Sequence, residues 1–244
     1  MSSKTIDFVL YSLRDFESPS VVAPIVECLL RAPLGFRVTH FGRDDANRRI
    51  GSADEIVRVV TGPPGRSGPR LGGALLRSGS ACEYQIQWAK MASPSFSLVI
   101  GSMSREPLAT QATRLGALED LVRQLTQVVD PVYGEIRDMS TLHAGAPIDL
   151  KTRLPEIPAV SIYGEPYVRL FGEECVRGAP FRSITLLDRH HYWLRASVSV
   201  IEPVDAVAGA AIREHFGEDA FMSGGRRLYR TGRAPQFDMT ELQP

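Results

Sequence analysis

The segment Pro158–Gly172, with the sequence PAVSIYGEPYVRLFG, decides the fold that we expect for the second half of the chain. Its first part is rich in β-branched residues and predicts a strand. The Gly164-Glu165-Pro166 sequence predicts a sharp turn, because glycine and proline interrupt regular structure. The aromatic residues that follow predict a short helix whose rings fill a core seam. The segment therefore predicts a strand-turn-helix corner, and it carries no evident reactive group.

Apolar periodicity predicts alternating strands and helices in the first half of the chain. Strands are expected at Ile6–Leu10, Phe36–Phe41, Cys82–Trp88, Ser95–Gly101 and Val132–Ile136. Helices are expected at Val22–Leu30, Asp54–Val60 and, as one continuous element, from Pro107 to Val129. Residues 61–73 are dense in glycine and proline and predict a loop. The pair Gly101-Ser102 is interpreted as a turn.

The second half continues with two more strands and a helix. Strands are expected at Phe181–Leu187 and Tyr192–Val200 around a turn at Asp188-Arg189. A helix that starts at Pro203 and is closed by Gly217 is expected next, with Val207 on its buried stripe. Residues 222–244 contain few apolar side chains and predict an irregular tail.

These elements predict an α+β fold with mixed, mainly antiparallel sheets flanked by helices. We expect an N-terminal α+β half at 1–139, a connecting segment at 140–156 and a C-terminal α+β half at 157–244 that includes the tail. One continuous domain is the alternative.

Composition and charge limit the possible partners. The chain has 244 residues, of which 43% are apolar, so it can bury a core. Its 28 basic and 28 acidic residues balance, which argues against general binding to nucleic acid or to an anionic membrane. The longest apolar runs are far shorter than the roughly 20 residues of a membrane span. No signal-peptide pattern is visible at the N-terminus, so we expect a cytoplasmic protein.

The sequence offers no convincing catalytic or metal-binding constellation. Cys28, Cys82 and Cys175 are scattered, so reduced cysteines without a disulfide or zinc site are expected. His190 and His191 with Asp188 could join His143 or His215 on paper, but neighbouring residues of a strand point to opposite faces. We expect one of the two adjacent rings to be solvated and the other packed near Tyr192. No cofactor is expected.

Cys175 and the glycine-rich loop are weak candidates for chemistry. The neighbouring Glu173 and Glu174 would disfavour a thiolate at Cys175. The loop lacks a Gly-Lys-Ser/Thr motif and contains prolines that remove backbone donors, so a phosphate cradle is not expected. Exposed carboxylates are more interesting as binding groups, since an inhibitor of a nuclease can use acidic residues in place of phosphate.

The segment Ile157–Gly172 resembles a pattern in immunity proteins of bacterial polymorphic toxin systems, and immunity family fifty-two or a relative is the best match. A long helix leading to DPVYGE at Asp130–Glu135 and a helix ending in HFGEDAF at His215–Phe221 extend the resemblance over about half of the chain. The resemblance implies a protein that neutralises a cognate toxin, possibly a nuclease effector of a secretion system, by stoichiometric occlusion. It implies no enzymatic activity and leaves the oligomeric state open.

Two further functions remain as alternatives: an adaptor or chaperone for a secreted effector, and an enzyme with a histidine and carboxylate site. The aromatic residues of the corner are expected to be structural before they are interface residues. Candidate partner-binding residues are Glu165, Tyr167, Arg169, Glu173, Glu174, Trp193, Glu218 and Asp219.

Overall fold

The computed structural model describes residues 5–33, 35–62, 70–79, 82–91, 93, 95–139, 149–222 and 232–243. These residues form ten strands and seven α-helices, and the strand pairs with a defined register are antiparallel, which confirms the α+β prediction. The chain divides into two compact units. Unit 1 comprises Met1–Ile6 and Val132–Phe237, and unit 2 comprises Asp7–Pro131 and Asp238–Pro244. The division expected at 140–156 stays a prediction.

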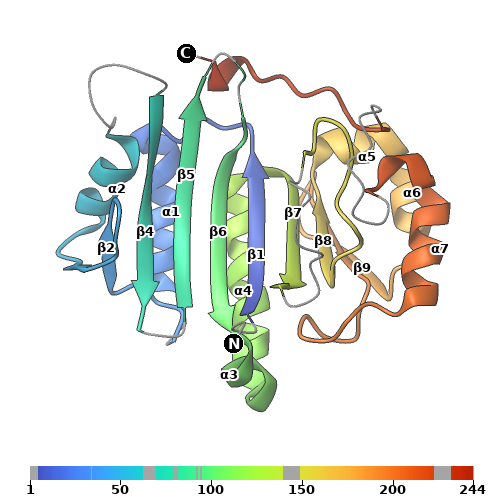
Figure 1. The fold of residues 1–244 in the computed structure, drawn as a ribbon, viewed down its shortest axis with the longest axis horizontal. Helices are drawn as coiled ribbons and strands as arrows, with labels where there is room; N and C mark the ends of the chain where they lie inside the picture. The colour runs from blue at the N-terminus through green and yellow to red at the C-terminus, as the bar shows by residue number, and fades with distance from the viewer. Residues whose placement is uncertain are drawn as a thin grey trace. The chain divides into compact units, whose positions relative to one another are not determined.

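Unit 2 contains six strands in the order β3-β2-β4-β5-β6-β1 (Figure 1). Their bounds are β1 Thr5–Ser12, β2 His40–Gly42, β3 Arg48–Arg49, β4 Arg70–Ser78, β5 Cys82–Lys90 and β6 Ser97–Ser104. The expected antiparallel pair of β5 and β6 is confirmed, with Ile86 opposite Val99. Buried residues alternate with half-buried or exposed residues along β1, β5 and β6, as expected for sheet residues that point to opposite faces.

Four helices belong to unit 2: α1 Pro19–Arg31, α2 Ala53–Thr61, α3 Arg105–Thr110 and α4 Ala112–Val129. α1 buries Val22, Ile25, Val26 and Leu29 on one stripe. It contacts both α2 and α4, and the three helices lie on one face of β4, β5 and β6 (Figure 1). The predicted helices at Val22–Leu30 and Asp54–Val60 are therefore confirmed.

The prediction of one helix from Pro107 to Val129 is wrong. The backbone is extended at Gln111 (φ −133°, ψ 97°), so α3 ends at Thr110 and α4 begins at Ala112. Leu108 and Leu118 are both buried, and α3 contacts α4. The apolar periodicity therefore continues across the break at Gln111. It shows which side chains face the core, but it does not show whether the backbone is a continuous helix.

Three other predictions in this part of the chain need correction. Most of Phe36–Phe41 forms a turn in which the Phe36 and Arg37 amides donate to the carbonyl of Pro33, and only His40 and Phe41 enter a strand. Gly101 and Ser102 lie inside β6 and form no turn. Of the predicted loop at 61–73, residues 70–73 belong to β4, residue 61 ends α2, and residues 63–69 lie outside the described part.

Unit 1 contains four strands in the order β7-β8-β10-β9. Their bounds are β7 Pro131–Asp138, β8 Val160–Tyr163, β9 Ser183–Leu186 and β10 Tyr192–Arg195. Tyr163 of β8 lies opposite Tyr133 of β7 and Tyr192 of β10, so these three side chains share one face. The expected strand pair around Asp188-Arg189 is confirmed, although both strands are shorter than predicted.

The predicted strand-turn-helix corner is confirmed in unit 1. β8 leads through Gly164, whose amide donates to the Val132 carbonyl, into α5 (Glu165–Phe171). Gly172 closes α5 with a φ of 88°, a value that glycine adopts without steric cost, and α6 (Glu173–Gly178) follows at once. Tyr163, Tyr167 and Phe171 form ring contacts with one another at 5.6–6.3 Å between centroids. The corner is therefore built on an aromatic core, as expected.

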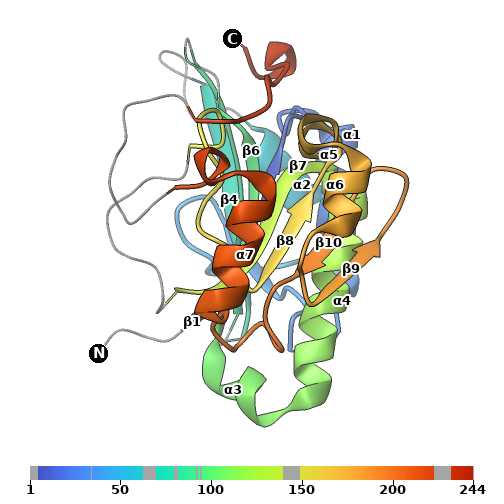
Figure 2. The ribbon, with the colours of Figure 1, turned by 90° about the vertical axis from the view of Figure 1, so that its right-hand side faces the viewer.

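The last helix of unit 1, α7 (Ala206–Phe216), starts later than predicted. Asp205 caps it by accepting hydrogen bonds from the amides of Val207 and Ala208 at 3.0 Å, and Pro203 precedes the cap. Val207 is 77% exposed, so its predicted place on the buried stripe is wrong. α6 and α7 lie side by side in both views of the ribbon (Figure 2).

The described part of the tail, 232–243, is irregular apart from a 3₁₀ turn at Thr240–Leu242, and a second 3₁₀ turn, Glu218–Ala220, follows α7. Within the described residues, no helix is both long and apolar enough to cross a membrane.

Candidate binding site

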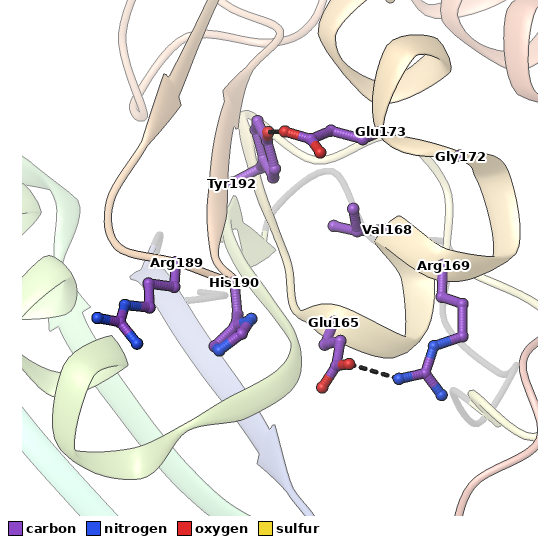
Figure 3. Close-up of a pocket in the computed structure, with 8 residues that line it drawn as sticks. All are labelled: Glu165, Val168, Arg169, Gly172, Glu173, Arg189, His190 and Tyr192. Atoms are coloured by element: carbon purple, nitrogen blue, oxygen red, sulfur yellow. Dashed lines mark hydrogen bonds and ion pairs between the residues drawn. The ribbon is translucent and has the colours of Figure 1, made fainter.

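A hollow of about 280 Å³ opens in unit 1 beside α5, the start of α6 and the turn before β10 (Figure 3). Its sides carry mainly charged and polar groups: Glu165 and Arg169 of α5, Glu173 of α6, Arg189 and His190 of the turn, and Tyr192 of β10. Val168 adds an apolar side chain to the lining. Charged side chains around a concave surface can recognise a charged group through charge-assisted hydrogen bonds.

Tyr192 holds Glu173 in place. Its hydroxyl donates to Glu173 Oε1 at 2.6 Å and accepts from Arg177 Nε at 3.1 Å. Burial together with the hydrogen bond to the carboxylate raises the pKa of Tyr192, and the same tyrosine and carboxylate raise the pKa of Arg177. Glu173 therefore presents a carboxylate of fixed orientation, whose other oxygen can meet a partner.

Glu165 and Arg169 form an ion pair along one side of α5, one helical turn apart (Figure 3). Both side chains are more than half exposed. Exposed pairs of this kind contribute little to stability, and either member can exchange its partner at small cost.

Asp188 orders the turn between β9 and β10. Its Oδ1 accepts from the amides of His190 and His191 at 2.8 and 3.0 Å, and its Oδ2 lies 2.8 Å from His191 Nδ1. Partial burial alone would raise the pKa of Asp188, but the hydrogen bonds from His190 and His191 lower it below its usual range. The turn is thereby fixed with Arg189 and His190 at its exposed end.

Arg189 and His190 have no hydrogen bond or ion pair from their side chains to any described residue. Both are exposed, and in Figure 3 they lie across the hollow from Glu173. The carboxylates on the other side are already paired with Arg169, Tyr192 and Arg177. The unmet hydrogen-bonding capacity of the hollow is therefore mostly that of donors, which suits an acidic group of a ligand or partner.

The structure brings three of the eight predicted binding residues, Glu165, Arg169 and Glu173, to this hollow. Glu174, Glu218 and Asp219 are exposed on α6 and after α7. Tyr167 and Trp193 are 0% and 1% exposed, so the structure places them in the core and not on a binding surface. Tyr167 packs among the rings of the corner, and Trp193 lies on β10 next to Tyr192 but on the opposite face.

Sequence reasoning missed Arg189, His190 and Tyr192 as members of one site with α5. The sequence around Arg189 indicates only a turn between two strands. The alternation of β10 could have shown that Tyr192 and Trp193 face opposite sides, but the closeness of that turn to α5 comes from the pairing of β8 with β10 and has no local signal.

Cys175 and His215 form a contact between α6 and α7 that the sequence did not predict. Cys175 Sγ lies 3.4 Å from His215 Nε2, but the same nitrogen lies only 2.8 Å from the Cys175 carbonyl oxygen. The shorter distance favours an Nε2 that carries a proton and donates it to the carbonyl. In that state Nε2 cannot accept the thiol proton, so the contact ties the two helices together and does not activate a nucleophile.

The adjacent histidines behave as expected: His191 is 4% exposed and His190 is exposed. Among the described residues, no group of three histidine, cysteine, aspartate or glutamate side chains is placed to hold a metal ion. His143 lies outside the described residues. Cys28, Cys82 and Cys175 are free thiols.

Comparison with solved structures shows a likeness of fold. No protein-family model matches the chain, and no curated protein matches it. A solved structure described as "Pseudomonas aeruginosa T6SS protein PA0821" is similar with a TM-score of 0.60 and 11% sequence identity, covering 87% of this chain and 75% of that chain. At this identity the likeness establishes a shared fold.

Proposed function

We propose that this chain is an immunity protein associated with a type VI secretion system, and that it neutralises a cognate toxin by binding it through the hollow of unit 1. Three observations support the proposal: the strand-turn-helix segment that resembles immunity proteins, the fold shared with a T6SS protein, and the hollow itself. The hollow carries most weight, because α5 of that same segment forms one of its sides.

The arrangement suits protein recognition because its groups are oriented before a partner arrives. Glu173 is held by Tyr192, and the turn that carries Arg189 is held by Asp188. Side chains that are already ordered lose less conformational entropy on binding. Arginine and tyrosine are also the residue types that most often dominate binding energy in interfaces.

The chemistry of the hollow indicates what it would contact on the toxin. Arg189 and His190 offer donors without a partner among the described residues, so they suit an acidic group, which on a protein toxin is a carboxylate. A nuclease that uses Mg²⁺ holds the ion with carboxylates, and an arginine placed among them would occupy the site of the ion. We therefore propose that Arg189 contacts acidic residues of the toxin at or near its active site.

Inhibition of this kind is stoichiometric and takes place in the cytoplasm, where a toxin from a neighbouring cell would act. A stable complex buries about 1,600 Å² in total, much more than one hollow provides. The exposed Glu174 of α6, beside Glu173, extends the proposed contact surface. Its carboxylate, and not that of the already paired Glu173, is the better candidate to stand in for a phosphate.

Co-expression with the toxin encoded beside this chain tests the proposal. Cells that carry the parent protein should grow, and the two proteins should co-purify in equal amounts. Arg189→Glu should weaken the complex by about 30-fold or more, because it replaces a buried charge pair by a repulsive one. Arg31→Glu is the matched control, since Arg31 is 81% exposed on α1 of unit 2.

Death of cells that express the parent protein, with no co-purification, would contradict the proposal. A second readout separates an immunity protein from an effector adaptor. Deletion of this chain should cost survival and leave secretion of the toxin intact, whereas loss of an adaptor would abolish secretion.

A further inference from the structure

β9 forms an open edge of the sheet in unit 1. It pairs with β10 on one side, and among the described residues no strand pairs with its other side. Ser183, Thr185 and Leu186 are exposed, and Leu186 is 45% exposed although it is apolar. Natural sheets protect such an edge by keeping the strand very short or with lysine, proline or a bulge; β9 has only four residues, but it contains no lysine or proline.

The hydrogen bonds to β10 show which backbone groups of β9 point outward. The Leu187 amide donates to the His191 carbonyl, and Leu186 lies opposite Tyr192. Because hydrogen-bonded and non-hydrogen-bonded pairs alternate along an antiparallel ladder, the backbone groups of Ser183 and Thr185 face β10. The amide and carbonyl of Ile184 and of Leu186 therefore point away from the sheet, toward any added strand.

The sequence around β9 is complementary to itself in one register. If two copies pair antiparallel with Thr185 opposite Thr185, Ile184 of each chain lies opposite Leu186 of the other. Those are the residues whose backbone groups point outward, so both pairs form hydrogen bonds. Ile184 and Leu186 also share a face, so the same register brings apolar side chains together.

Charge favours the same register. Arg182 then lies opposite Asp188 of the other copy, at both ends of the paired segment. Arg182 is exposed and makes no ion pair with a described residue, and the Asp188 side chain is 32% exposed. A shift by two residues in one direction would place Arg182 opposite the apolar Leu186. A shift by two residues in the other direction would place Asp188 opposite Ile184. Either shift loses the Arg182–Asp188 charge pair.

We propose that β9 is a homodimerisation edge, at which a second copy of this chain adds antiparallel to β9 around a twofold axis at Thr185. The paired strands are short, so the dimer is weak and depends on protein concentration. Dimerisation through β9 does not involve the Arg189 side chain, so it is independent of the proposed toxin binding.

Single cysteines at two positions test the register. In the proposed dimer the two Thr185 Cα atoms form a non-hydrogen-bonded pair about 4.5 Å apart, a separation that a disulfide can span. Thr185→Cys should therefore give a disulfide-linked dimer under mild oxidation. Ser183→Cys is the matched control: Ser183 is also exposed and lies on the same face of β9, but its two copies would be about 13 Å apart and should not cross-link. The parent, with its three native cysteines, gives the background.

Sedimentation of the unmodified chain supplies the second measurement. The mass should rise toward that of two chains as the concentration increases to on the order of 0.5 mM. Ile184→Pro should abolish this rise without breaking the pairing with β10, because the amide that it removes points outward. Val207→Lys, at an exposed apolar residue on α7, should leave the rise in mass with concentration unchanged.

Equal cross-linking of both cysteine variants, or no more than background for Thr185→Cys, would overturn the proposal. A chain that stays monomeric throughout would also overturn it. If Ile184→Pro weakened toxin binding while every sample was monomeric, the edge would belong to the toxin contact and the dimer would be wrong.

Discussion

Tyr192 and Glu173 join β10 to α6 through a hydrogen bond of 2.6 Å between the phenol and the carboxylate. The bond crosses from the sheet to the helix that follows the strand-turn-helix corner. Arg177 lies 3.1 Å from the same hydroxyl and 3.4 Å from the same carboxylate oxygen, so the three side chains form a closed cluster at the edge of the hollow.

Tyr192→Phe should weaken toxin binding more than it weakens the fold. The change removes one hydrogen bond, which corresponds to about 1 kcal/mol in the free energy of unfolding. It also leaves Arg177 as the one remaining described partner of the Glu173 carboxylate, so Glu173 should be less well oriented and affinity for the toxin should fall. Tyr84→Phe is the control, because it removes a tyrosine hydrogen bond of similar length, 2.7 Å to the Phe36 carbonyl, from a residue that does not line the hollow. Equal toxin affinity for both variants would refute the role of Tyr192 in orienting Glu173.

Glu135→Ala should be among the most destabilising substitutions in unit 1. Glu135 is 1% exposed, forms an ion pair with the buried Arg137 and accepts a 3.0 Å hydrogen bond from Tyr133. Removing it leaves a buried arginine without that partner, which costs about 3–5 kcal/mol. Denaturant unfolding measures the loss. A change below about 1 kcal/mol, the usual value for exposed ion pairs, would show that Glu135 is not buried in solution.

Gly101→Ala should destabilise unit 2 because no room exists for the added methyl group. A Cβ at this position of β6 would lie 2.2 Å from a ring carbon of Phe8. Overpacking of this kind costs about 1–3 kcal/mol. The loss should shrink in the double variant Gly101→Ala with Phe8→Leu, since the smaller side chain makes space.

Gly116→Ala should raise the free energy of unfolding, in contrast to Gly101→Ala, which should lower it. Gly116 lies in α4 with no neighbouring atom within 4 Å of an added Cβ. The substitution should stabilise the chain by up to about 1 kcal/mol, because alanine favours a helix over glycine. Equal effects of the two alanine substitutions on the melting temperature would contradict the packing described for β6.

Asp188 should make stability depend on acid pH. Because the folded state lowers the pKa of this carboxylate, its contribution is present above the pKa of the unfolded chain and is lost as pH falls through the lower folded value. We expect Asp188→Asn to lose about 1–2 kcal/mol at pH 7 and much less at pH 2. Unfolding titrations at the two pH values measure this difference. The same loss at both would mean that the charge of Asp188 contributes nothing to the turn.

Cys28 and Cys82 should react slowly with alkylating reagents in the folded chain. Burial raises the pKa of Cys28 to about 11 and that of Cys82 to about 12. At pH 8 a thiol with a pKa near 11 is only about 0.1% thiolate, the form that reacts. Iodoacetamide should label both residues slowly in the folded chain and rapidly in denaturant, as mass spectrometry would show. Fast labelling of Cys82 in the folded chain would contradict its burial.

Patterns within one element predicted much of the fold. Three of the confirmed features depend on residues within a single strand, helix or corner: the alternation that ends at Leu10, the apolar stripe from Val22 to Leu29, and the turn at Gly164–Pro166. The break at Gln111 and the turn at Phe36 escaped prediction because neither removes an apolar residue from the core. Periodicity cannot distinguish a continuous helix from two helices that bury the same face.

The candidate site was only half predictable for a related reason. Glu165, Arg169 and Glu173 lie in neighbouring elements and could be chosen from the corner itself. Arg189 and His190 reach the hollow because β10 pairs with β8, a relationship between segments about thirty residues apart. Tyr167 and Trp193 were placed among the candidates by residue type, but burial determines whether an aromatic residue can meet a partner.

Calorimetric titration of the purified toxin into this chain tests the central claim most directly. We predict a saturable complex with one toxin per chain and a dissociation constant of about 1 nM or lower, weakened at least about 30-fold by Arg189→Glu and unchanged by Arg31→Glu. No binding by the parent, or equal affinity for the parent and Arg189→Glu, would contradict the claim that the hollow of unit 1 recognises the toxin.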